Sequence, residues 1–326
     1  MGSARDAGVW SDHAGHGLMH VVYKSEPQRG LYWQRWLAEH APDIHLHLWP
    51  ETGDAAQVDA LVAWLPPDDL MACFPNLKVL FSVGAGAEQF DLSTLPGYIP
   101  LVRTIEPGLT QGMVEYVTFA VLGLHRDMPR YFQQQRHQQW QAHLAMPASQ
   151  RRIGIMGLGE LGRAALAQLQ SMGFDCGGWS RTPHHIAGVP CWHGDDQLSD
   201  FLARSDILVC LLPLTSSTQG RLNAGLFGQL PAGAALVQVG RGPQLNHQDL
   251  LDALDSGQLR AAVIDVTDPE PLPAGHAFWT HPAVWLTPHI ASQTQNDSAI
   301  KALLANLRRF QRGEPLVGVV DRSRGY

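Results

Sequence analysis

Residues 152–163 read RIGIMGLGELGR, an apolar run followed at once by closely spaced glycines. The run at 153–156 is typical of a buried parallel strand, and a helical apolar pattern follows the glycines. The glycines have the spacing G-x-G-x-x-G: Gly157, Gly159 and Gly162. In such a turn the first glycine permits a sharp bend, the second lets a pyrophosphate approach the backbone, and the third lets strand and helix pack closely.

The helix that follows these glycines offers free N–H groups and a partial positive charge at its N-terminus, which attract an anion. The stretch therefore predicts a dinucleotide site, with a plain strand–helix turn as the alternative.

Length and composition favour a two-domain globular protein. The chain has 326 residues, of which 45% are hydrophobic and 16% charged; this is long for one core. The net charge of −7 provides no basic field, so we expect no nucleic-acid partner. The cysteines form no C-x-x-C pair, which fits a cytoplasmic protein without a disulfide framework or a zinc site: Cys73, Cys176, Cys191 and Cys210.

The first eighteen residues contain no apolar core of the kind that a secretory signal needs. We interpret them as a tail or an alternative start before Met19, with His13, His16 and His20 as incidental rather than metal-binding residues. Nowhere does an apolar run approach the roughly 20 residues of a membrane span. We expect no metal and no membrane partner.

Strand-like and helical segments alternate along the chain, which predicts parallel sheets covered by helices. Before the glycine turn, strands are expected at 20–24, 43–49, 60–64, 77–84 and 99–103, with helices at 31–41 and 68–74. After it, strands are expected at 174–179, 206–212, 235–240, 260–266 and 284–290, with helices near 198, 226, 249–254 and 293–310. Residues 314–320 suggest one more strand or an extended segment.

A long helical pattern connects the two halves, from Thr110 to about Trp140. Pro129 is expected to end or kink this helix. The glutamine-rich part beyond it is interpreted as a second segment or an exposed arm. In the strand at 43–49, His45 and His47 share the polar face, where solvated histidines are favoured over a metal pair.

Four reactive side chains lie where apolar strands of the second half end, the edge at which open α/β sheets bind ligands. They are Arg241, Asp265, Glu270 and His289. Arginine pairs with a carboxylate and polarises a carbonyl, and histidine exchanges a proton near neutral pH. Beside a dinucleotide, this set fits hydride transfer to a 2-oxo acid, with His289 protonating the new alkoxide. Taken singly, each residue also has a structural interpretation as a surface, solvated, cap or turn residue.

Motifs along the chain resemble those of the D-isomer-specific 2-hydroxyacid dehydrogenases, and most closely the glyoxylate/hydroxypyruvate reductase A branch. The resemblance covers nearly everything from Met19 onward. It rests on SVGAGAEQFD at 82–91, MVEYV at 113–117, HRDMPRYFQQQ at 125–135, GIMGLGELG at 154–162, LVCLLPLTSSTQG at 208–220, LVQVGRG at 236–242, IDVTDPEPLP at 264–273 and LTPHIAS at 286–292.

The resemblance implies reduction of glyoxylate to glycolate and of hydroxypyruvate to D-glycerate. Arg241 would bind the substrate carboxylate and carbonyl, His289 would be the general acid and base, and Glu270 its partner. Substrate would also meet the backbone N–H groups of Gly84, Ala85 and Gly86 and the side chain of Trp64, for which a core tryptophan is the alternative. The cofactor site would comprise Gly157, Leu158, Gly159, Glu160, Leu161, Gly162, Ser180, Arg181, Thr182, Leu212, Pro213, Val239 and Asp265.

The family fold implies an α/β protein with two doubly wound parallel-sheet domains and an active-site cleft between them. A flavodoxin-like substrate domain would take residues 1–104 and 291–326, and a Rossmann cofactor domain residues 105–290. The resemblance also implies a homodimer built on the cofactor domain and its long helix.

The residues that meet the adenine ribose predict the choice of cofactor. An NAD site normally presents an acid there, about twenty residues past the glycines. Here Ser180, Arg181 and Thr182 stand at that place, and no acid does. Hydroxyls and a guanidinium suit a 2′-phosphate, which an acid would repel. We therefore predict NADPH (NADP+), with NADH as the alternative.

Three rival interpretations differ in what they would require of the sequence. A formate dehydrogenase-like enzyme would carry glutamine in place of Glu270. A reductase of a bulkier 2-oxo acid stays open, because pocket size is not legible from sequence. A non-enzymatic, cofactor-sensing scaffold similar to the corepressor relatives would be expected to carry docking or regulatory segments, and none is evident.

One residue departs from the family pattern. Thr267 stands where many relatives have an aromatic residue, and this change would reshape the pocket floor.

Overall fold

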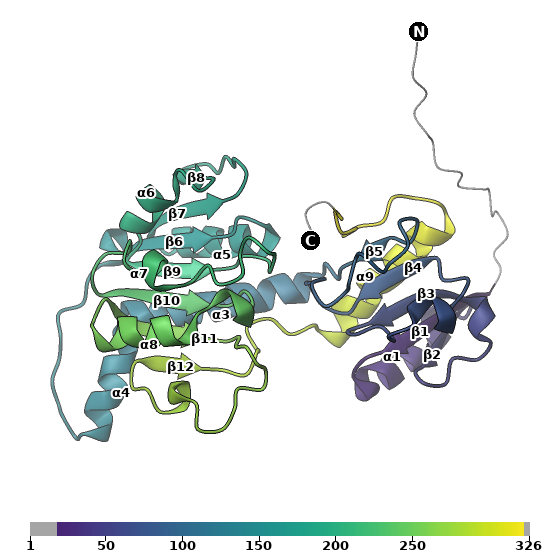
Figure 1. Cartoon of the computed structure of the whole chain (residues 1–326), viewed down its shortest axis with the longest axis horizontal. Coiled ribbons are helices and arrows are strands. Elements are labelled where there is room, and N and C mark those ends of the chain that lie inside the picture. Colours follow the sequence, from purple (N-terminus) through teal and green to yellow (C-terminus); the bar gives the residue numbers. More distant parts are fainter. Residues whose placement is uncertain (1–17, 323–326) are drawn as a thin grey trace, which may run out of the picture. The chain divides into compact units, whose positions relative to one another are not determined.

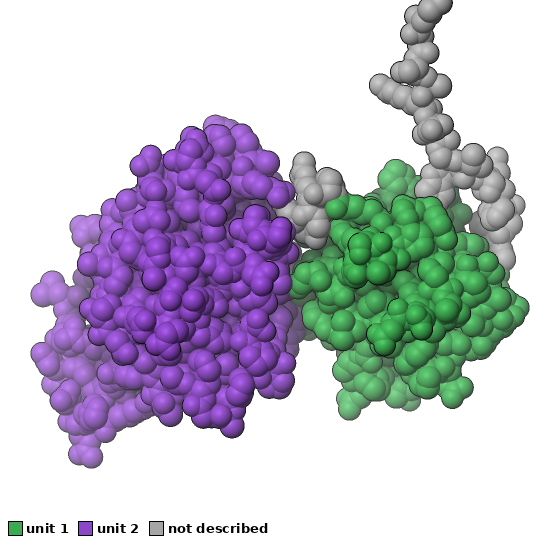
Figure 2. Space-filling view, in the orientation of Figure 1, with its two compact units in different colours: residues 1–109, 294–326 green, residues 110–293 purple. Residues whose placement is uncertain are grey.

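Two parallel sheets form the framework of the chain in a computed structural model that describes residues 18–322. The sheets belong to two compact units, coloured separately in Figure 2. Unit 1 runs to Leu109 and resumes at Thr294, whereas unit 2 is the continuous segment Thr110–Gln293. The boundaries expected from the sequence lie a few residues earlier at both crossings.

Unit 1 is built on a five-stranded sheet in the order β2-β1-β3-β4-β5, the order of flavodoxin-like sheets (Figure 1). Its elements are β1 (Met19–Lys24), α1 (Pro27–His40), β2 (Ile44–Leu48), β3 (Val58–Ala63), α2 (Leu70–Cys73), β4 (Val79–Ser82), β5 (Leu101–Val102) and, after the return of the chain, α9 (Asn296–Gln311). Each neighbouring pair of strands is parallel.

Helix α1 begins earlier than the apolar pattern predicts, because Glu26 and Pro27, which precede that pattern, favour a helix start. The carboxylate of Glu26 accepts the N–H groups of Gln28 and Arg29, both at 2.7 Å. Pro27 occupies the first helical position, where its missing N–H costs nothing. Trp33 is fully packed in the core that α1 and α9 share with the sheet.

Unit 2 contains a seven-stranded parallel sheet in the order β12-β11-β10-β9-β6-β7-β8. Its elements are α3 (Pro107–His125, which starts in unit 1), α4 (Met128–Arg136), β6 (Arg152–Met156), α5 (Glu160–Ser171), β7 (Asp175–Ser180), β8 (Cys191–His193), α6 (Leu198–Ala203), β9 (Ile207–Cys210), α7 (Ala224–Phe227), β10 (Ala234–Gln238), α8 (His247–Asp255), β11 (Leu259–Ile264) and β12 (Val284–Leu286). Short 3₁₀ turns lie at Ala55–Gln57, Ala148–Gln150, Gly242–Gln244 and Ala277–Trp279.

The order of the strands in unit 2 is that of a Rossmann sheet. Helices α3 and α5 contribute to the apolar core on one face, and α6, α7 and α8 to that on the other (Figure 1). The strand order reverses between β6 and β9, and ligands of such sheets bind beyond the carboxyl ends of the strands at this point. Two doubly wound parallel-sheet units are therefore confirmed.

The long helical pattern after Thr110 is interrupted where the sequence contains a proline. Asp127 has a left-handed backbone with φ 55°, and Pro129 lies in the first turn of α4. The glutamine-rich part is thus a second helix, and an irregular arm (residues 137–147) follows it. Strand β8 is an element that the sequence patterns do not predict. Residues 314–320 are extended, with a single antiparallel bridge between Val102 and Val319.

The histidine predictions have different outcomes. His13 and His16, with most of the expected tail, lie outside the described residues. His45 is exposed, while His47 is half-buried with its Nε2 atom 3.0 Å from Nδ1 of His20. Between residues 18 and 322 there is no group of three or more His, Cys, Asp or Glu side chains that could hold a metal ion. In the same range, no helix is both long and apolar enough to cross a membrane.

Candidate active site

The glycine turn after β6 has the geometry that its spacing predicts. Gly157 has φ +112°, and a Cβ there would lie 2.7 Å from the carbonyl oxygen of Leu211 in the loop after β9. A Cβ on Gly162 would lie 1.9 Å from the carbonyl oxygen of Gly157, so helix α5 packs directly on the turn. A Cβ on Gly159 would meet nothing within 4 Å. The second glycine thus leaves open space at the helix N-terminus.

This open space fits a pyrophosphate. Gly159 is the N-cap of α5 and has no side chain with which to bind the first N–H groups. Those groups and the helix dipole are available to an anion at the point where the sheet order reverses. Glu160 is exposed, and Leu161 is half-buried. Leu158 is buried against Gly178, so its backbone is the part that a ligand would meet.

Beyond β7, the residues predicted to read the 2′-phosphate lie together in one tight turn. The Ser180 hydroxyl donates to the carbonyl of Thr182 at 2.8 Å and lies 3.0 Å from Nδ1 of His184. The same Nδ1 lies 3.0 Å from the Thr182 carbonyl, which requires a proton on Nδ1. Arg181 and Thr182 are exposed, whereas Ser180 is buried. The sequence reasoning missed His184, although it follows Ser180 by only four residues.

Arg241 lies on a loop between two glycines, each at a close approach of backbones. A Cβ on Gly240 would lie 3.0 Å from the carbonyl oxygen of Leu212, and one on Gly242 would lie 1.9 Å from that of Thr267. The loops after β9, β10 and β11 therefore meet at Arg241. Its guanidinium donates to the carbonyl of Gly240 at 2.8 Å.

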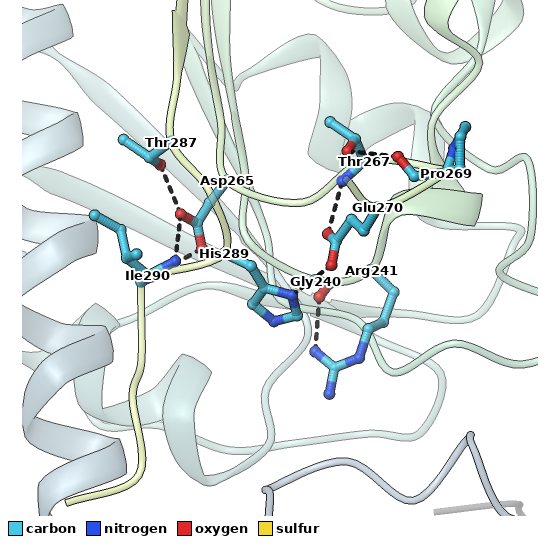
Figure 3. Close-up of polar contacts among 10 residues, drawn as sticks. Gly240, Arg241, Asp265, Thr267, Pro269, Glu270, Thr287, His289 and Ile290 are labelled. Carbon is cyan, nitrogen blue, oxygen red and sulfur yellow. Dashed lines mark hydrogen bonds and ion pairs between the residues drawn. The ribbon is translucent and has the colours of Figure 1, made fainter. Parts of the chain in front are cut away.

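His289 and Glu270 form a hydrogen-bonded pair beside Arg241 (Figure 3). Nδ1 of His289 lies 2.9 Å from Oε2 of Glu270. The other oxygen of Glu270 accepts the N–H of Thr267 at 3.0 Å. The Thr267 hydroxyl donates to the carbonyl of Pro269 at 3.0 Å, so this departure from the family pattern braces the loop that carries Glu270.

The pair shifts the acidity of both partners. The hydrogen bond to Glu270 and the charge of that carboxylate raise the pKa of His289, against the opposing effects of burial and of Arg241. Burial by itself would raise the pKa of Glu270. The hydrogen bonds from His289 and the Thr267 amide, together with the charges of His289 and Arg241, outweigh burial and leave this pKa lowered. The arrangement favours an imidazolium that faces an ionised carboxylate.

Asp265 holds the loop on which His289 lies. Its buried carboxylate accepts the Thr287 hydroxyl at 2.6 Å and the N–H groups of Ile290 and Ala291, both at 2.8 Å (Figure 3). The backbone N–H of His289 donates to the Asp265 carbonyl at 2.8 Å. These bonds retain His289 at φ 54°, a left-handed conformation that costs a non-glycine residue about 1–2 kcal/mol. The implied place of Asp265 in the cofactor site stays a prediction.

A hydroxyl relay extends from Asp265 to α3. The Tyr116 hydroxyl is hydrogen-bonded to that of Thr287, which bonds to Asp265 in turn. Burial raises the pKa of Tyr116 to about 12, with Asp265 adding to the rise and the Thr287 bond opposing it. The sequence reasoning missed Tyr116 and Thr287, because only the fold brings α3 beside the end of β12.

The remaining predicted cofactor residues line the ends of β9 and β10. Leu212 and Val239 are buried in the core, and their role in the cofactor site stays a prediction. The carbonyl of Pro213 accepts the Thr218 hydroxyl at 2.7 Å.

In unit 1, the loop after β4 contains the predicted carboxylate site. Ser82, which is fully buried, donates to the Gly86 carbonyl at 2.8 Å and accepts the Gly84 N–H at 3.3 Å. Within residues 18–322, no protein acceptor is found for the N–H groups of Ala85 and Gly86. Trp64 is 39% exposed and lies against Gly84, where a Cβ would be 2.9 Å from its ring. It is therefore not a core tryptophan.

Comparison with known proteins gives relatives over nearly the full chain. The family described as "D-isomer specific 2-hydroxyacid dehydrogenase, NAD binding domain" matches residues 118–291. A glyoxylate/hydroxypyruvate reductase A from Yersinia enterocolitica is 37% identical over 314 residues, 94% of this chain and 100% of the relative.

Two solved structures are similar throughout. A D-isomer specific 2-hydroxyacid dehydrogenase from Xanthobacter autotrophicus, in complex with NADPH and MES, has a TM-score of 0.90 and 37% identity, and the match covers 95% of this chain and 100% of that one. An NADPH-dependent glyoxylate/hydroxypyruvate reductase from Sinorhizobium meliloti, in complex with NADP and sulfate, has a TM-score of 0.84 and 34% identity over 94% and 100% of the two chains. The chain belongs to the D-isomer specific 2-hydroxyacid dehydrogenase family.

Proposed function

We propose that this protein is an NADPH-dependent reductase of small 2-oxo acids, which converts glyoxylate to glycolate and hydroxypyruvate to D-glycerate. One observation carries the proposal: the His289–Glu270 pair, at 2.9 Å, lies beside Arg241 in the unit whose sheet also carries the glycine turn. The names of the relatives from Yersinia enterocolitica and Sinorhizobium meliloti support the same activity and cofactor.

Unit 2 would hold the cofactor. The open N-terminus of α5 suits the pyrophosphate, and the turn of Ser180, Arg181 and Thr182 suits the 2′-phosphate. When bound, NADPH supplies the hydride that reduces the carbonyl carbon of the substrate. The match to an NAD binding domain at 118–291 supports this assignment, and unit 1 would then be the substrate domain.

The chain's own side chains would handle the proton and the negative charge. His289, kept protonated by Glu270, donates a proton to the oxygen of the reduced carbonyl. Arg241 orients the substrate carboxylate and polarises its carbonyl. The free N–H groups of Ala85 and Gly86 in unit 1 suit a carboxylate, which supports the role of this unit as a substrate domain.

His289→Ala tests the mechanism. Loss of the proton donor should lower kcat/KM for glyoxylate by about 10²- to 10⁴-fold, as measured by the absorbance change when NADPH is oxidised. His281→Ala is a suitable control, because that histidine pairs with Asp255 outside the candidate site. Unimpaired turnover by His289→Ala would contradict the mechanism.

A rate comparison tests the function itself. Purified protein should oxidise NADPH faster than NADH, and with glyoxylate or hydroxypyruvate faster than with pyruvate or phenylpyruvate. A preference for phenylpyruvate would favour a reductase of bulkier 2-oxo acids. Binding of NADPH without turnover of any of the four acids would favour a cofactor-sensing scaffold.

We further propose a homodimer formed through the arm. Hydrogen bonds from Gln134 to the Gln141 carbonyl (3.3 Å) and from the His143 N–H to the Tyr131 hydroxyl (2.9 Å) tie the arm to α4. Its large apolar side chains nevertheless stand in solvent: Trp140 is 104% exposed and Leu144 103%. Such side chains on an ordered segment favour burial against a second copy.

All four cysteines are free thiols, which supports a cytoplasmic location.

A further inference from the structure

A buried glutamine, Gln244, lies between two loops of the candidate site. Its side chain is fully buried. Its oxygen accepts the backbone N–H of Arg241 at 2.8 Å and the side-chain amide of Gln238 at 3.3 Å. Its nitrogen donates to the carbonyls of Leu212 and Pro213, both at 3.0 Å. One amide group therefore uses both of its ends on the backbone of neighbouring loops.

The surroundings fix the orientation of this amide. Its oxygen faces donors, the Arg241 N–H, the Gln238 amide and the more distant Cys210 thiol at 3.9 Å. Its nitrogen faces two carbonyls. A flipped amide would set donors against donors and acceptors against acceptors, and lose every bond. The contacts thus require a group that accepts at one end and donates at the other.

Gly240 creates the space that the Gln244 amide occupies. A Cβ on Gly240 would lie 2.4 Å from Oε1 of Gln244. The loops that follow β9 and β10 meet there, and Gln244 joins them. The side chain of Arg241 extends from one of these loops, and the carbonyls of Leu212 and Pro213 belong to the other.

Gln238 supports the same arginine at its other end. It is fully buried in β10, and its nitrogen donates to the Arg241 carbonyl at 2.8 Å. The peptide groups on both sides of the Arg241 Cα are therefore held by buried glutamines, Gln244 at the N–H and Gln238 at the carbonyl. The oxygen of Gln238 is buried and has no hydrogen-bond partner among the described residues, a cost that an apolar side chain would avoid.

We propose that Gln244 is a positioning residue that couples Arg241 to the cofactor-binding loop, with Gln238 as a support of Arg241 and of the Gln244 amide. The inference rests on the proposed function, which gives Arg241 and the Leu212–Pro213 segment their roles. Because both glutamines are fully buried, they act through the backbone and not on the substrate.

The test replaces each glutamine by methionine, which keeps the length of the side chain and removes its polar contacts. Gln258 offers a matched control: its nitrogen also donates to two carbonyls, those of Phe227 (2.8 Å) and Leu230 (3.0 Å). It precedes β11, whereas Arg241 follows β10, so the two residues lie at opposite ends of these parallel strands. Thermal unfolding, the Kd for NADPH by fluorescence titration, and kcat and KM for glyoxylate are measured for all three variants.

Gln244→Met should lower kcat/KM for glyoxylate at least about tenfold and raise the Kd for NADPH, because small displacements of positioning groups have large kinetic effects. Gln238→Met should raise the KM for glyoxylate and raise the Kd for NADPH less than Gln244→Met does, because Gln238 makes no bond to the cofactor-binding loop itself. Gln258→Met should lower the unfolding temperature but keep the wild-type kinetic constants and Kd.

Kinetic constants of folded Gln244→Met that match those of Gln258→Met would overturn the proposal. If Gln244→Met does not fold, Gln238→Met decides, since a wild-type KM for glyoxylate would contradict the role assigned to this network. If the wild-type protein reduces no 2-oxo acid, the proposed function fails instead. The NADPH titration of Gln244→Met then still tests the coupling to the cofactor loop.

Discussion

The two side chains of the His289–Glu270 pair each stabilise the charged form of the other. The carboxylate raises the pKa of His289, and the bonds from His289 and Thr267 lower that of Glu270 against the effect of burial. Between these two pKa values the pair adds to folding stability. The contribution of Glu270 is lost as pH falls through its lowered pKa, and that of His289 as pH rises through its raised pKa.

Glu270→Gln should therefore change the pH dependence of reduction. The reaction needs a protonated His289, so kcat/KM for glyoxylate falls as pH rises through the pKa of this residue. Without the carboxylate that pKa drops, and the fall in activity should move to lower pH. A pH profile of both proteins measures the shift, and unchanged midpoints would show that Glu270 does not set the acidity of His289.

The turn after β7 supports a prediction about cofactor choice. Arg181 is exposed next to the buried Ser180, where a 2′-phosphate would lie. Arg181→Ala should raise the KM for NADPH and leave that for NADH nearly unchanged, because NADH has no phosphate for the guanidinium to meet. Arg126→Ala, at an exposed arginine directly after α3, is the control and should leave both KM values unchanged. An equal rise for both cofactors would place the role of Arg181 elsewhere.

Reactive residues could be predicted one by one, because chemistry and position at a strand end suffice to suggest Arg241, Glu270 and His289. Their supports could not. Gln244 and Ser82 contact backbone atoms that lie far away in the sequence or around a turn, and nothing in the chain's apolar pattern marks those partners. For Asp265 the sequence predicts a place in the cofactor site. It does not reveal that the carboxylate bonds to Thr287, Ile290 and Ala291 and so holds the loop that carries His289.

At the scale of the element, two glycines at the start of helix α5 have different roles: one is needed for packing, and the other leaves space for a ligand. Gly162 is needed for the fold, since its Cβ would lie 1.9 Å from a carbonyl oxygen, whereas the Cβ of Gly159 would meet only open space. The backbone of Gly159, with φ −70°, also suits alanine.

Gly159→Ala should therefore fold with an unchanged unfolding temperature and raise the Kd for NADPH, because the new methyl group would stand where the pyrophosphate approaches. Gly162→Ala should destabilise the protein by about 1–3 kcal/mol or more, as overpacked cores do. Thermal unfolding and fluorescence titration distinguish the two effects. Equal losses of stability in both variants would contradict this assignment.

Most elements could be predicted from periodicity, since apolar runs and amphipathic patterns determine burial locally. Strand β8 could not be predicted, because its three residues are all half-buried and show no apolar alternation. It is a strand only through its pairing with β7. The start of α1 depends on the Glu26 cap rather than on apolar spacing, and so it falls earlier than the pattern.

For the molecule as a whole, the arm provides the test of assembly. Replacing Trp140 and Leu144 by serine removes the apolar surface proposed to bury itself against a second copy. Light scattering after gel filtration should give a dimer for the wild type and a monomer for the double variant. Tyr98→Ser, at another exposed aromatic residue (71%) in unit 1, should leave the mass unchanged. A monomeric wild type would refute the homodimer.

The sequence pattern predicts two units, whereas the return of the chain to the first unit follows only from the resemblance to the family. Two strand–helix series appear, and the glycine turn opens the second. The residues at which the chain crosses could not be predicted as well, because α3 runs through the first crossing without any break in its apolar pattern.

The late return of α9 has a consequence for synthesis on the ribosome. The buried residues Ala299, Ile300, Leu303 and Leu307 cover the sheet of unit 1, yet they are made after all of unit 2. The five strands of unit 1 thus emerge first, and the part of their apolar face that α1 does not cover stays exposed while unit 2, whose segment is continuous, completes its own core. Nascent chains stalled before residue 296 should accordingly bind chaperones through their oldest, not their newest, part.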